Sequence, residues 1–517
     1  MLAPPVATSF GRSRVRGKPP VALALMALMA LIAIAVRAYP WIRAHTLPGV
    51  MEYDDGVYYG ASRLLLHGML PYRDFTIVHP PLTSVLLLPF ASIGAVLGDS
   101  VGMASARAGM VVVAVTNLLL VYRLALRLPA REDRRRLAAG AAAALYAVMP
   151  DAVIAEQTVL LEPLVSLGCL LAISVLLNAT PATRTRTALA GVLIAAAIGV
   201  KLFAGVYVIA VCLWLVLGRQ PRLIPPFALG LAGGGVALFL PFGLVAPQAF
   251  WHDVVVTQLS RPLDATANGA SRVVGMTGLR LVPLSVGLLL LTFLAGSAFI
   301  WTKRQPASPL TLWLLVGVLG GVAFTQSPSY FPHYGAFLAP PMAMVGSRFA
   351  AGVSARRWTD RANGAALVGL LAAFGVGAVA ADLRWHGQPD LHRAGGLVPT
   401  GSCVYYDTVS RAIAADLFAA PRRRCRGWID GRGVALTYNT RWPPGRSFYP
   451  AGFLADDRWQ RETVGQLEQA DWLLLRRTPD RLPEWTATTQ GYALQHFTPV
   501  WVGGSGATRA ELWRRVS

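Results

Sequence analysis

The residues best suited to chemistry are two neighbouring carboxylates, Asp54 and Asp55, in the segment YDDGVYYG. An ionised carboxylate at a membrane surface can accept a proton from a hydroxyl group or coordinate a divalent cation. Neighbouring side chains cannot both point into one tight pocket, so we expect one to act while the other is oriented elsewhere. The alternative is structural, with either residue capping the helix that contains the run ASRLLLHG.

A third carboxylate and a lysine mark two later apolar segments. Glu162, in LEPL, stands at the start of an apolar helix, and the alternative to a catalytic role is capping assisted by the helix dipole. Glu156 competes with Glu162 for any functional role. Lys201, in GVKLF, interrupts an apolar hairpin, and an ammonium there suits an anionic lipid headgroup such as a phosphate. The alternative for Lys201 is snorkelling to the interface.

Other polar residues at the same face are predicted to bind substrate. His79 precedes two prolines in HPPL, Gln258 and Arg261 lie in TQLSRPLD, and His333 and Tyr334 lie in YFPHYG. An isolated histidine at a membrane entrance is more often a hydrogen-bonding residue of the interface than a catalyst. No cysteine or histidine spacing resembles a zinc site, and the metal content stays open.

These residues require a membrane scaffold to position them. Of the 517 residues, 54% are hydrophobic and only 14% are charged, whereas a soluble protein carries roughly a quarter charged residues. Several apolar stretches reach about 18 residues or more, which indicates an all-α polytopic membrane protein and excludes disorder and a transmembrane β-barrel. The net charge of +21 reflects basic membrane loops rather than a nucleic-acid partner.

The distribution of basic residues predicts the topology. The basic segment GRSRVRGK precedes the first, uncleaved helix and places the N-terminus in the cytoplasm, and later basic loops fall on the same side. The proline-containing stretch 80–98 would invert every later loop if it crossed, so we expect it to lie at the outer interface. The C-terminal part then lies outside the cytoplasm, as do most of the carboxylates. With the first helix, eleven spans are predicted, the other ten being 102–127, 136–152, 159–177, 187–200, 203–218, 223–245, 281–300, 309–325, 334–350 and 364–382.

Two domains follow from this map. Residues 1–383 form the transmembrane domain, whose first outer loop covers about 39–101, and residues 384–517 form a small extracytoplasmic α/β domain. In the latter, short apolar runs such as SCVYYD, DWLLLRR and HFTPVWVG alternate with helix-like stretches. Cys403 and Cys425 lie in this part and are predicted to pair in an oxidising compartment, with two unpaired thiols as the alternative.

Together these motifs resemble the polyprenyl-phosphate-sugar-dependent glycosyltransferases of the C superfamily (GT-C), which include lipid A aminoarabinose transferases and protein O-mannosyltransferases. Asp54 and Asp55 match the early acidic pair, Glu162 matches a second acidic residue at an outer helix start, and Lys201 matches the lysine that ends a later short span. His79 stands where lysine is common in the aminoarabinose branch, and Glu162 where aspartate is more usual. The likeness covers most of the chain in order and topology, and these departures leave the donor sugar open.

The resemblance implies an inverting glycosyltransferase that moves a sugar from a polyprenyl-phosphate donor to an extracytoplasmic glycan, lipid or protein acceptor. It implies Asp54 as the base, Asp55 and Glu162 as acceptor-positioning or alternative catalytic carboxylates, and Lys201, His79 and Arg261 as phosphate ligands. The resemblance identifies no definite cofactor, and a divalent cation held by the carboxylates stays open. The arginine-rich, lysine-poor usage suggests a GC-rich bacterial genome, and hence a bacterial plasma membrane. The competing class is a transporter or flippase of lipid-linked sugars, which would use the same groups without breaking a bond.

Overall fold

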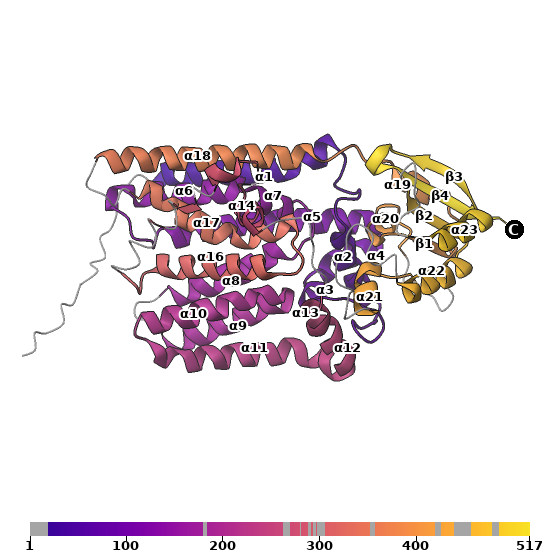
Figure 1. Ribbon diagram of the computed structural model, residues 1–517, viewed down its shortest axis with the longest axis horizontal. Helices are drawn as coiled ribbons and strands as arrows, with labels where there is room; N and C mark the ends of the chain where they lie inside the picture. The colour runs from indigo at the N-terminus through magenta and orange to yellow at the C-terminus, as the bar shows by residue number, and fades with distance from the viewer. Residues whose placement is uncertain are drawn as a thin grey trace, which may run out of the picture.

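The chain folds into a bundle of long helices with a smaller α/β region at one end (Figure 1). The basic N-terminal residues and most of the predicted span 281–300 lie outside the described residues. The computed structural model describes residues 19–178, 183–261, 269–279, 281–287, 291–292, 296, 305–351, 357–418, 425, 427–438, 456–477 and 485–516.

Each predicted apolar span that falls within the described residues is helical. The 334–350 stretch is a succession of three short helical pieces, in which two prolines open the central one. The helices of the bundle are α1 (Pro19–Arg43), α5 (Asp99–Ala125), α6 (Arg135–Val148), α7 (Pro150–Glu156), α8 (Glu162–Leu176), α9 (Arg184–Val200), α10 (Gly205–Leu217), α11 (Ile224–Val245), α14 (Gly269–Met276), α16 (Pro309–Gln326), α17 (Ala339–Gly346) and α18 (Arg357–Leu383). Single turns of other helix types are η1 (Glu132–Arg134), η2 (Leu202–Ala204), η3 (Pro221–Leu223), η4 (His252–Val256), η5 (Pro332–Leu338), η6 (Ser347–Ala350) and η8 (Gly506–Thr508).

The structure is that of a multi-pass membrane protein. Five helices in the described part of the chain are long and apolar enough to cross a membrane, and a sixth span results if α6 and α7, bent by 59°, are taken together. Helices α8, α9 and α10 are shorter. At 1.5 Å per residue, each of them is shorter than the roughly 30 Å of a bilayer core. The predicted count of eleven spans is therefore not established.

The segment predicted as the first outer loop forms three short helices beside the α/β region: α2 (Tyr53–Leu66), α3 (Leu82–Leu86) and α4 (Leu88–Leu97). The stretch 80–98, predicted as one interfacial helix, is split into α3 and α4, with Pro89 in the first turn of α4. Neither piece is long enough to span, and α4 exposes Val96 and Leu97, as a helix lying on an apolar phase would. Two further short helices, α12 (Pro247–Trp251) and α13 (Thr257–Leu259), follow α11.

The C-terminal α/β region holds a four-stranded sheet in the order β1-β2-β4-β3. Strands β1 (Val404–Tyr406) and β2 (Trp472–Arg476) are parallel, whereas β4 (Ala510–Arg515) is antiparallel to both β2 and β3 (Phe497–Gly503). The three apolar runs singled out in the sequence are β1, β2 and β3, and the predicted Cys403–Cys425 disulfide is confirmed. The surrounding helices are α19 (Leu391–Gly395), α20 (Val409–Ala414), α21 (Gly431–Tyr438), α22 (Asp457–Gln469) and α23 (Ala487–His496).

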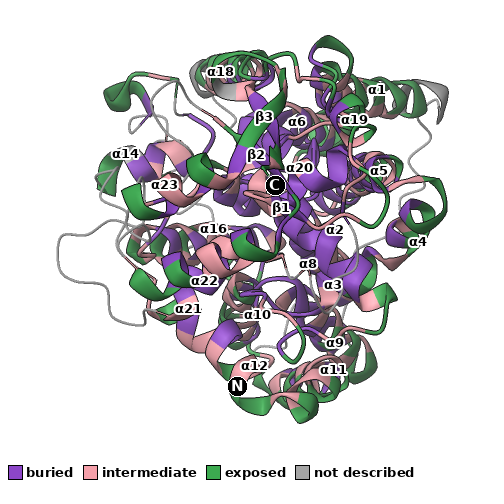
Figure 2. Cartoon of the chain, turned by 90° about the vertical axis from the view of Figure 1, so that its right-hand side faces the viewer, coloured by how far each residue is buried: buried purple, intermediate pink, exposed green. Residues whose placement is uncertain are grey.

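The α/β region is joined to the bundle through buried residues. Viewed from that end, α2 and α20 lie buried at the centre, one against the other (Figure 2). Asp416 accepts hydrogen bonds from the Ser100 N–H (2.8 Å) and Oγ (2.9 Å), so a residue of the α/β region caps the start of α5. Gly56 of α2 lies so close to Ser410 of α20 that an added Cβ would stand 2.3 Å from Ser410 Oγ and 2.5 Å from its backbone nitrogen.

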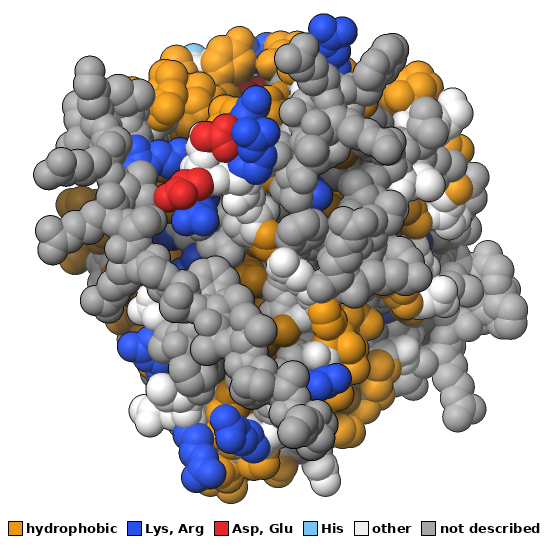
Figure 3. All heavy atoms as spheres, turned by 90° about the vertical axis from the view of Figure 1, so that its left-hand side faces the viewer, with side chains coloured by type: hydrophobic (Ala, Val, Ile, Leu, Met, Phe, Trp, Pro, Cys, Tyr) orange, Lys and Arg blue, Asp and Glu red, His pale blue; other side chains and the backbone are white. Residues whose placement is uncertain are grey.

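The opposite end of the bundle is basic. Figure 3 shows Lys and Arg side chains spread over that face, and the loops after α5 and before α11 lie there (Figure 1). The described basic loops 131–136, 183–186 and 218–222 thus lie away from the α/β region, as the positive-inside rule requires if that region is extracytoplasmic.

Reporter fusions test this arrangement. Fusions after residue 135 and after residue 390 should report opposite sides of the membrane, because the two positions lie at opposite ends of the bundle. The fusion after residue 135 should report the cytoplasmic side, and an extracytoplasmic signal there would contradict the interfacial placement of α3 and α4.

The close contact at Gly56 gives a stability prediction. Gly56→Ala should lower the free energy of unfolding by about 1–3 kcal/mol, because the added methyl group must displace the backbone of α20. Gly140→Ala is the matched control, since Gly140 is also helical but an added Cβ meets nothing within 4 Å. Thermal unfolding in detergent measures both, and equal midpoints would contradict the packing described here.

Candidate functional site

A cavity of about 190 Å³ lies where one end of the helical bundle meets the α/β region. Tyr58, Ile154 and Pro332 belong to its lining and come from α2, α7 and η5. Six of the nine residues predicted from the sequence line it: Asp54, His79, Lys201, Arg261, His333 and Tyr334. Asp55, Glu162 and Gln258 do not, although each contacts or adjoins a residue that does.

The neighbouring carboxylates Asp54 and Asp55 face different surroundings, as their adjacency on one helical turn predicts. Asp54 is half-buried at the cavity, and no side chain of the described residues forms a hydrogen bond or ion pair with it. A carboxylate without a protein partner remains available to a substrate.

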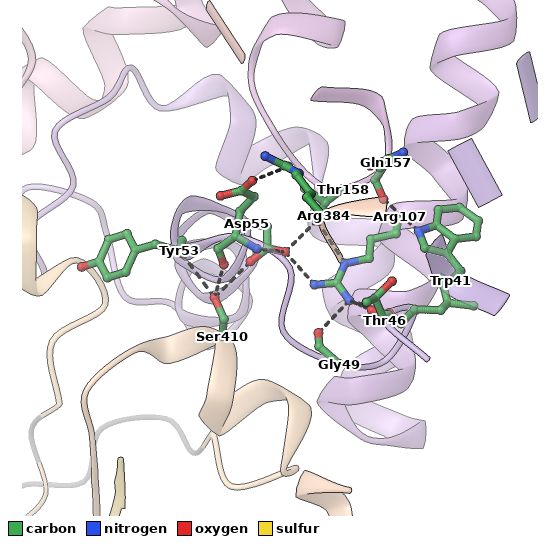
Figure 4. A network of polar contacts seen from close by, with 12 residues as sticks. Trp41, Thr46, Gly49, Tyr53, Asp55, Arg107, Gln157, Thr158, Arg384 and Ser410 are labelled. Carbon is green, nitrogen blue, oxygen red and sulfur yellow. Dashed lines mark hydrogen bonds and ion pairs between the residues drawn. The ribbon is translucent and has the colours of Figure 1, made fainter. Parts of the chain in front are cut away.

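Asp55 is fully buried in a polar network (Figure 4). Its Oδ2 accepts hydrogen bonds from Arg107 (2.6 Å) and Thr158 (2.6 Å), and its Oδ1 accepts one from Ser410 (3.0 Å). Oδ2 also lies 3.4 Å from the Glu52 N–H and takes part in the capping box at the start of α2. The structure therefore gives Asp55 the capping role and leaves the cavity to Asp54.

Lys201 is held at the cavity by the ends of two helices. Helix α9 ends at Val200, and Lys201 is extended, with its Nζ 2.5 Å from Oε1 of Glu162, the first residue of α8. The same ammonium stands 3.9 Å from the centre of the Tyr334 ring, and His333 lies 4.0 Å from Glu162. Glu162 is thus placed as the counter-ion of Lys201, behind the wall of the cavity.

A second cavity, of about 260 Å³, shares part of its wall with the first. Both are lined by His79, Lys201, Arg261, Ser329 and Tyr334. Away from this shared wall, the lining of the second cavity is mostly apolar, and it includes Leu202, Phe203, Val206 and Leu259, together with the predicted Gln258. A polar cavity and an apolar cavity therefore meet at a shared wall that contains two cations, Lys201 and Arg261.

Two buried polar atoms at the shared wall lack partners among the described residues. They are Nε of Arg261 and Oγ of Ser329. The guanidinium of Arg261 also makes a long contact, of 3.5 Å, with the Tyr334 hydroxyl. Most buried polar groups in native proteins are satisfied by protein or by water, so these two are available to water or to the acceptor oxygens of a ligand.

His79 contributes to the wall as a neutral group. Its burial, reinforced by Arg261 and Lys201, holds the pKa of His79 well below its usual value. It can exchange hydrogen bonds with an anion but adds no charge. Gln258 donates to the backbone carbonyl of Val78, next to His79, which places it as a support of this loop.

The α/β region and its linker bring residues to the first cavity that the sequence analysis did not single out. They are Arg384, in the linker, and Asp430 and Arg432, which precede and open α21. Glu52, the residue before α2, also lines the cavity and pairs with Arg384 at 2.9 Å. Burial raises the pKa of Glu52 to about 6, and burial with the negative Asp54 nearby raises that of Asp430 to about 6. The segment WIDGRG carries no spacing that ties it to YDDG, so only the tertiary structure shows their proximity.

Glu156, considered as a rival of Glu162, is part of the bundle interior. It pairs with Arg37 of α1 and accepts a hydrogen bond from Tyr146 (2.7 Å), and all three side chains are buried away from both cavities. As for metals, the described residues contain no group of three or more His, Cys, Asp or Glu side chains that could hold an ion.

Comparisons with known proteins agree on the fold. No protein-family model matches the sequence, and no curated protein is significantly similar to it. Among solved structures, ArnT from Cupriavidus metallidurans bound to undecaprenyl phosphate is similar with a TM-score of 0.59 and 11% identity, over 97% of this chain and 99% of that one. The apo oligosaccharyltransferase of Archaeoglobus fulgidus is similar with a TM-score of 0.54 and 14% identity, over 88% of this chain and 70% of that one. A complex of Archaeoglobus fulgidus AglB with an inhibitory peptide and a dolichol-phosphate gives 0.50 and 14%, over 88% and 69%. These are GT-C glycosyltransferases, and the resemblance seen in the sequence is confirmed at the level of the fold.

The raised pKa of Asp430 predicts a pH-dependent stability. The folded protein takes up this proton near pH 6 and the unfolded chain only near 4, so the carboxylate destabilises the fold at pH 7, and this cost declines as the pH falls towards 5. Asp430→Asn should therefore raise the unfolding midpoint at pH 7, and its advantage should shrink by about 1 kcal/mol between pH 7 and pH 5. Thermal unfolding of both proteins at the two pH values measures this, and an advantage independent of pH would contradict the assignment.

Proposed function

We propose that this protein is an integral membrane glycosyltransferase that moves a sugar from a polyprenyl-phosphate donor to an acceptor hydroxyl on the extracytoplasmic side. The observation that carries the proposal is the meeting of a polar and an apolar cavity at a wall with Lys201, Arg261 and two unpartnered buried donors. An amphiphile with an anionic group between a polar head and an apolar tail fits both cavities at once.

The phosphate belongs at the shared wall. Lys201 supplies a positive charge held by Glu162, and Arg261 supplies a guanidinium that has no carboxylate partner among the described residues. Ser329 and neutral His79 add hydrogen-bonding groups on the same surface. These groups also stabilise the charge that grows on the phosphate as the sugar leaves, which is the electrostatic part of the catalysis.

The lipid tail belongs in the second cavity. Leu202, Phe203 and Val206 form its wall at the start of α10, and Leu259 of α13 lines it while 80% of that residue is exposed. An exposed leucine at the rim of an apolar cavity is suited to contact with lipid, so a polyprenyl chain can enter from the bilayer.

Asp54 is the base of the reaction. The acceptor hydroxyl gives its proton to Asp54 as its oxygen attacks the anomeric carbon, the bond from that carbon to the phosphate oxygen breaks, and the electron pair stays on the departing polyprenyl phosphate. The proton on Asp54 then passes to water, so Asp54 is regenerated. A single displacement of this kind inverts the anomeric configuration.

The similar structures support the lipid-phosphate part of the proposal, because the ArnT structure is bound to undecaprenyl phosphate and the AglB complex contains a dolichol-phosphate. The donor sugar and the acceptor (glycan, lipid or protein) are left open by the cavity. We further propose that the chain lies in a bacterial plasma membrane with its N-terminus in the cytoplasm, and that residues 384–517 form an extracytoplasmic domain.

The direct test is incubation of the purified protein with a panel of undecaprenyl-phosphate sugars. A glycosyltransferase releases undecaprenyl phosphate in the presence of its acceptor. A transporter of lipid-linked sugars would bind members of the panel and release none, and that result would overturn the proposal.

Variants of Asp54 and Lys201 should distinguish proton acceptance from binding of the donor phosphate. Asp54→Asn removes proton acceptance and should lower turnover by roughly 10² or more while donor binding survives. Lys201→Ala should weaken donor binding and also slow the chemical step, and Lys201→Arg should restore the function only in part, because a planar guanidinium replaces a point charge.

Asp55→Asn is the matched control on the same helix. It should destabilise the fold by about 3 kcal/mol or more, because Arg107 is left buried without its counter-charge, whereas Asp54→Asn should leave the unfolding midpoint nearly unchanged. Single-turnover rates and unfolding midpoints are the measurements. A normal single-turnover rate for Asp54→Asn would end the assignment of Asp54 as the base.

A further inference from the structure

We propose that Asp430 binds hydrogen-bond donors on the ring of the donor sugar and is a residue that determines which sugar is transferred. The inference rests on the proposed function and deepens it. The α/β region, which carries Asp430, then supplies part of the sugar site as well as closing one end of the bundle.

Asp430 is rigidly oriented by two hydrogen bonds to the same oxygen. Its Oδ1 accepts from the Gly433 N–H (2.7 Å) and from the Tyr53 hydroxyl (3.1 Å). Tyr53 is also fixed, because its hydroxyl accepts from the Arg432 N–H at 3.0 Å. Tyr53 directly precedes Asp54. The hydrogen bond from Tyr53 therefore joins Asp430 of the α/β region to the helix that carries the proposed base.

The other oxygen of Asp430 is left for a ligand. Only 5% of the residue is exposed, yet within the described ranges no side chain forms a hydrogen bond with Oδ2 and no cation forms an ion pair with the carboxylate. Two other buried carboxylates of this end are paired with cations: Asp55 with Arg107 and Glu162 with Lys201. A buried carboxylate without a counter-ion is costly, and here the cost falls on a residue that lines the cavity.

The position of Asp430 in the first cavity indicates that its ligand is the sugar of the donor. A donor whose phosphate occupies the wall of Lys201 and Arg261 must extend its sugar into the first cavity, which Asp430 lines together with Asp54. The base takes the acceptor proton, so the second carboxylate is free to accept hydrogen bonds from the ring. An ionised carboxylate accepts from hydroxyl groups more strongly than a neutral group does.

The neighbouring glycine is adapted to this role. A Cβ on Gly433 would stand 2.1 Å from Asp430 Oδ2, so any side chain at position 433 would push the carboxylate away from its present place. Gly433 lines the cavity itself. Gly433→Ala therefore displaces Asp430 without removing its charge, which makes it an independent second variant.

The experiment measures equilibrium binding of two probes to the purified full chain: undecaprenyl phosphate, and the undecaprenyl-phosphate sugar that the wild type uses best. Asp430→Asn keeps both bonds to Oδ1, because the amide oxygen accepts them, and alters the other oxygen alone. It should lower the affinity for the sugar-bearing donor by roughly 10-fold to 100-fold and leave the affinity for undecaprenyl phosphate within about twofold. Gly433→Ala should act in the same direction. Asp456→Asn, which changes a helix cap in the α/β region away from the cavity, should bind both probes as the wild type does.

Each result supports or overturns the inference. A lower affinity for the sugar-bearing donor alone, with weaker discrimination among the sugars of the panel, supports it. Unchanged donor affinity overturns it, even if an acceptor then binds more weakly, and so does an equal loss for both probes. If the wild type fails to bind undecaprenyl phosphate at all, the proposed function itself fails, and that outcome is distinct from a failure confined to Asp430.

Discussion

The buried ion pair between Asp55 and Arg107 is the interaction on which the arrangement of the site depends. Both side chains are fully buried, and the guanidinium also donates to the backbone carbonyls of Thr46, Leu47 and Gly49. In a region of low dielectric, neither charge can lose its partner without a large cost. These interactions therefore fix α2 to α5 and to the segment that precedes α2. The hydrogen bond from Ser410 to Asp55 also joins α2 to the α/β region.

This constraint explains why two adjacent carboxylates have different roles. With Asp55 committed to the interior, the preceding side chain in the first turn of α2 points in another direction, and Asp54 reaches the cavity. The pair of Lys201 and Glu162 works in the same way at the end of α9, where a buried charge orients the one that faces the cavity. In both places a paired carboxylate supports a neighbour that remains available to a ligand.

The sequence predicts the local elements well because apolar length and charge are local properties. The starts and ends of α8 and α9, the three strands and the disulfide all follow from runs of residues and their flanks. The tertiary partners do not. The predicted role of Glu162 is that of an acceptor-positioning or alternative catalytic carboxylate, and nothing in LEPL shows that Lys201, far along the chain, lies 2.5 Å from it. Asp430 and Arg432 lie at the cavity, where both are hydrogen-bonded to the hydroxyl of Tyr53 in α2, and no spacing in the sequence indicates this proximity. The predicted span 136–152 differs from the structure, because α6 and α7 meet at a bend of 59° where Pro150 begins α7.

The disulfide between Cys403 and Cys425 bears on how the cavity meets its ligand. Cys403 immediately precedes β1, and Cys425 lies shortly before Asp430, so the cross-link ties the chain leading to this carboxylate to the edge of the sheet. A covalent tie of this kind removes conformational freedom when the protein folds rather than when it binds. The chain before Asp430 then loses this conformational entropy when the protein folds and the disulfide forms. A ligand that binds later meets a preorganised cavity wall. Formation of this disulfide would thus contribute to the affinity of a site whose own residues include no cysteine.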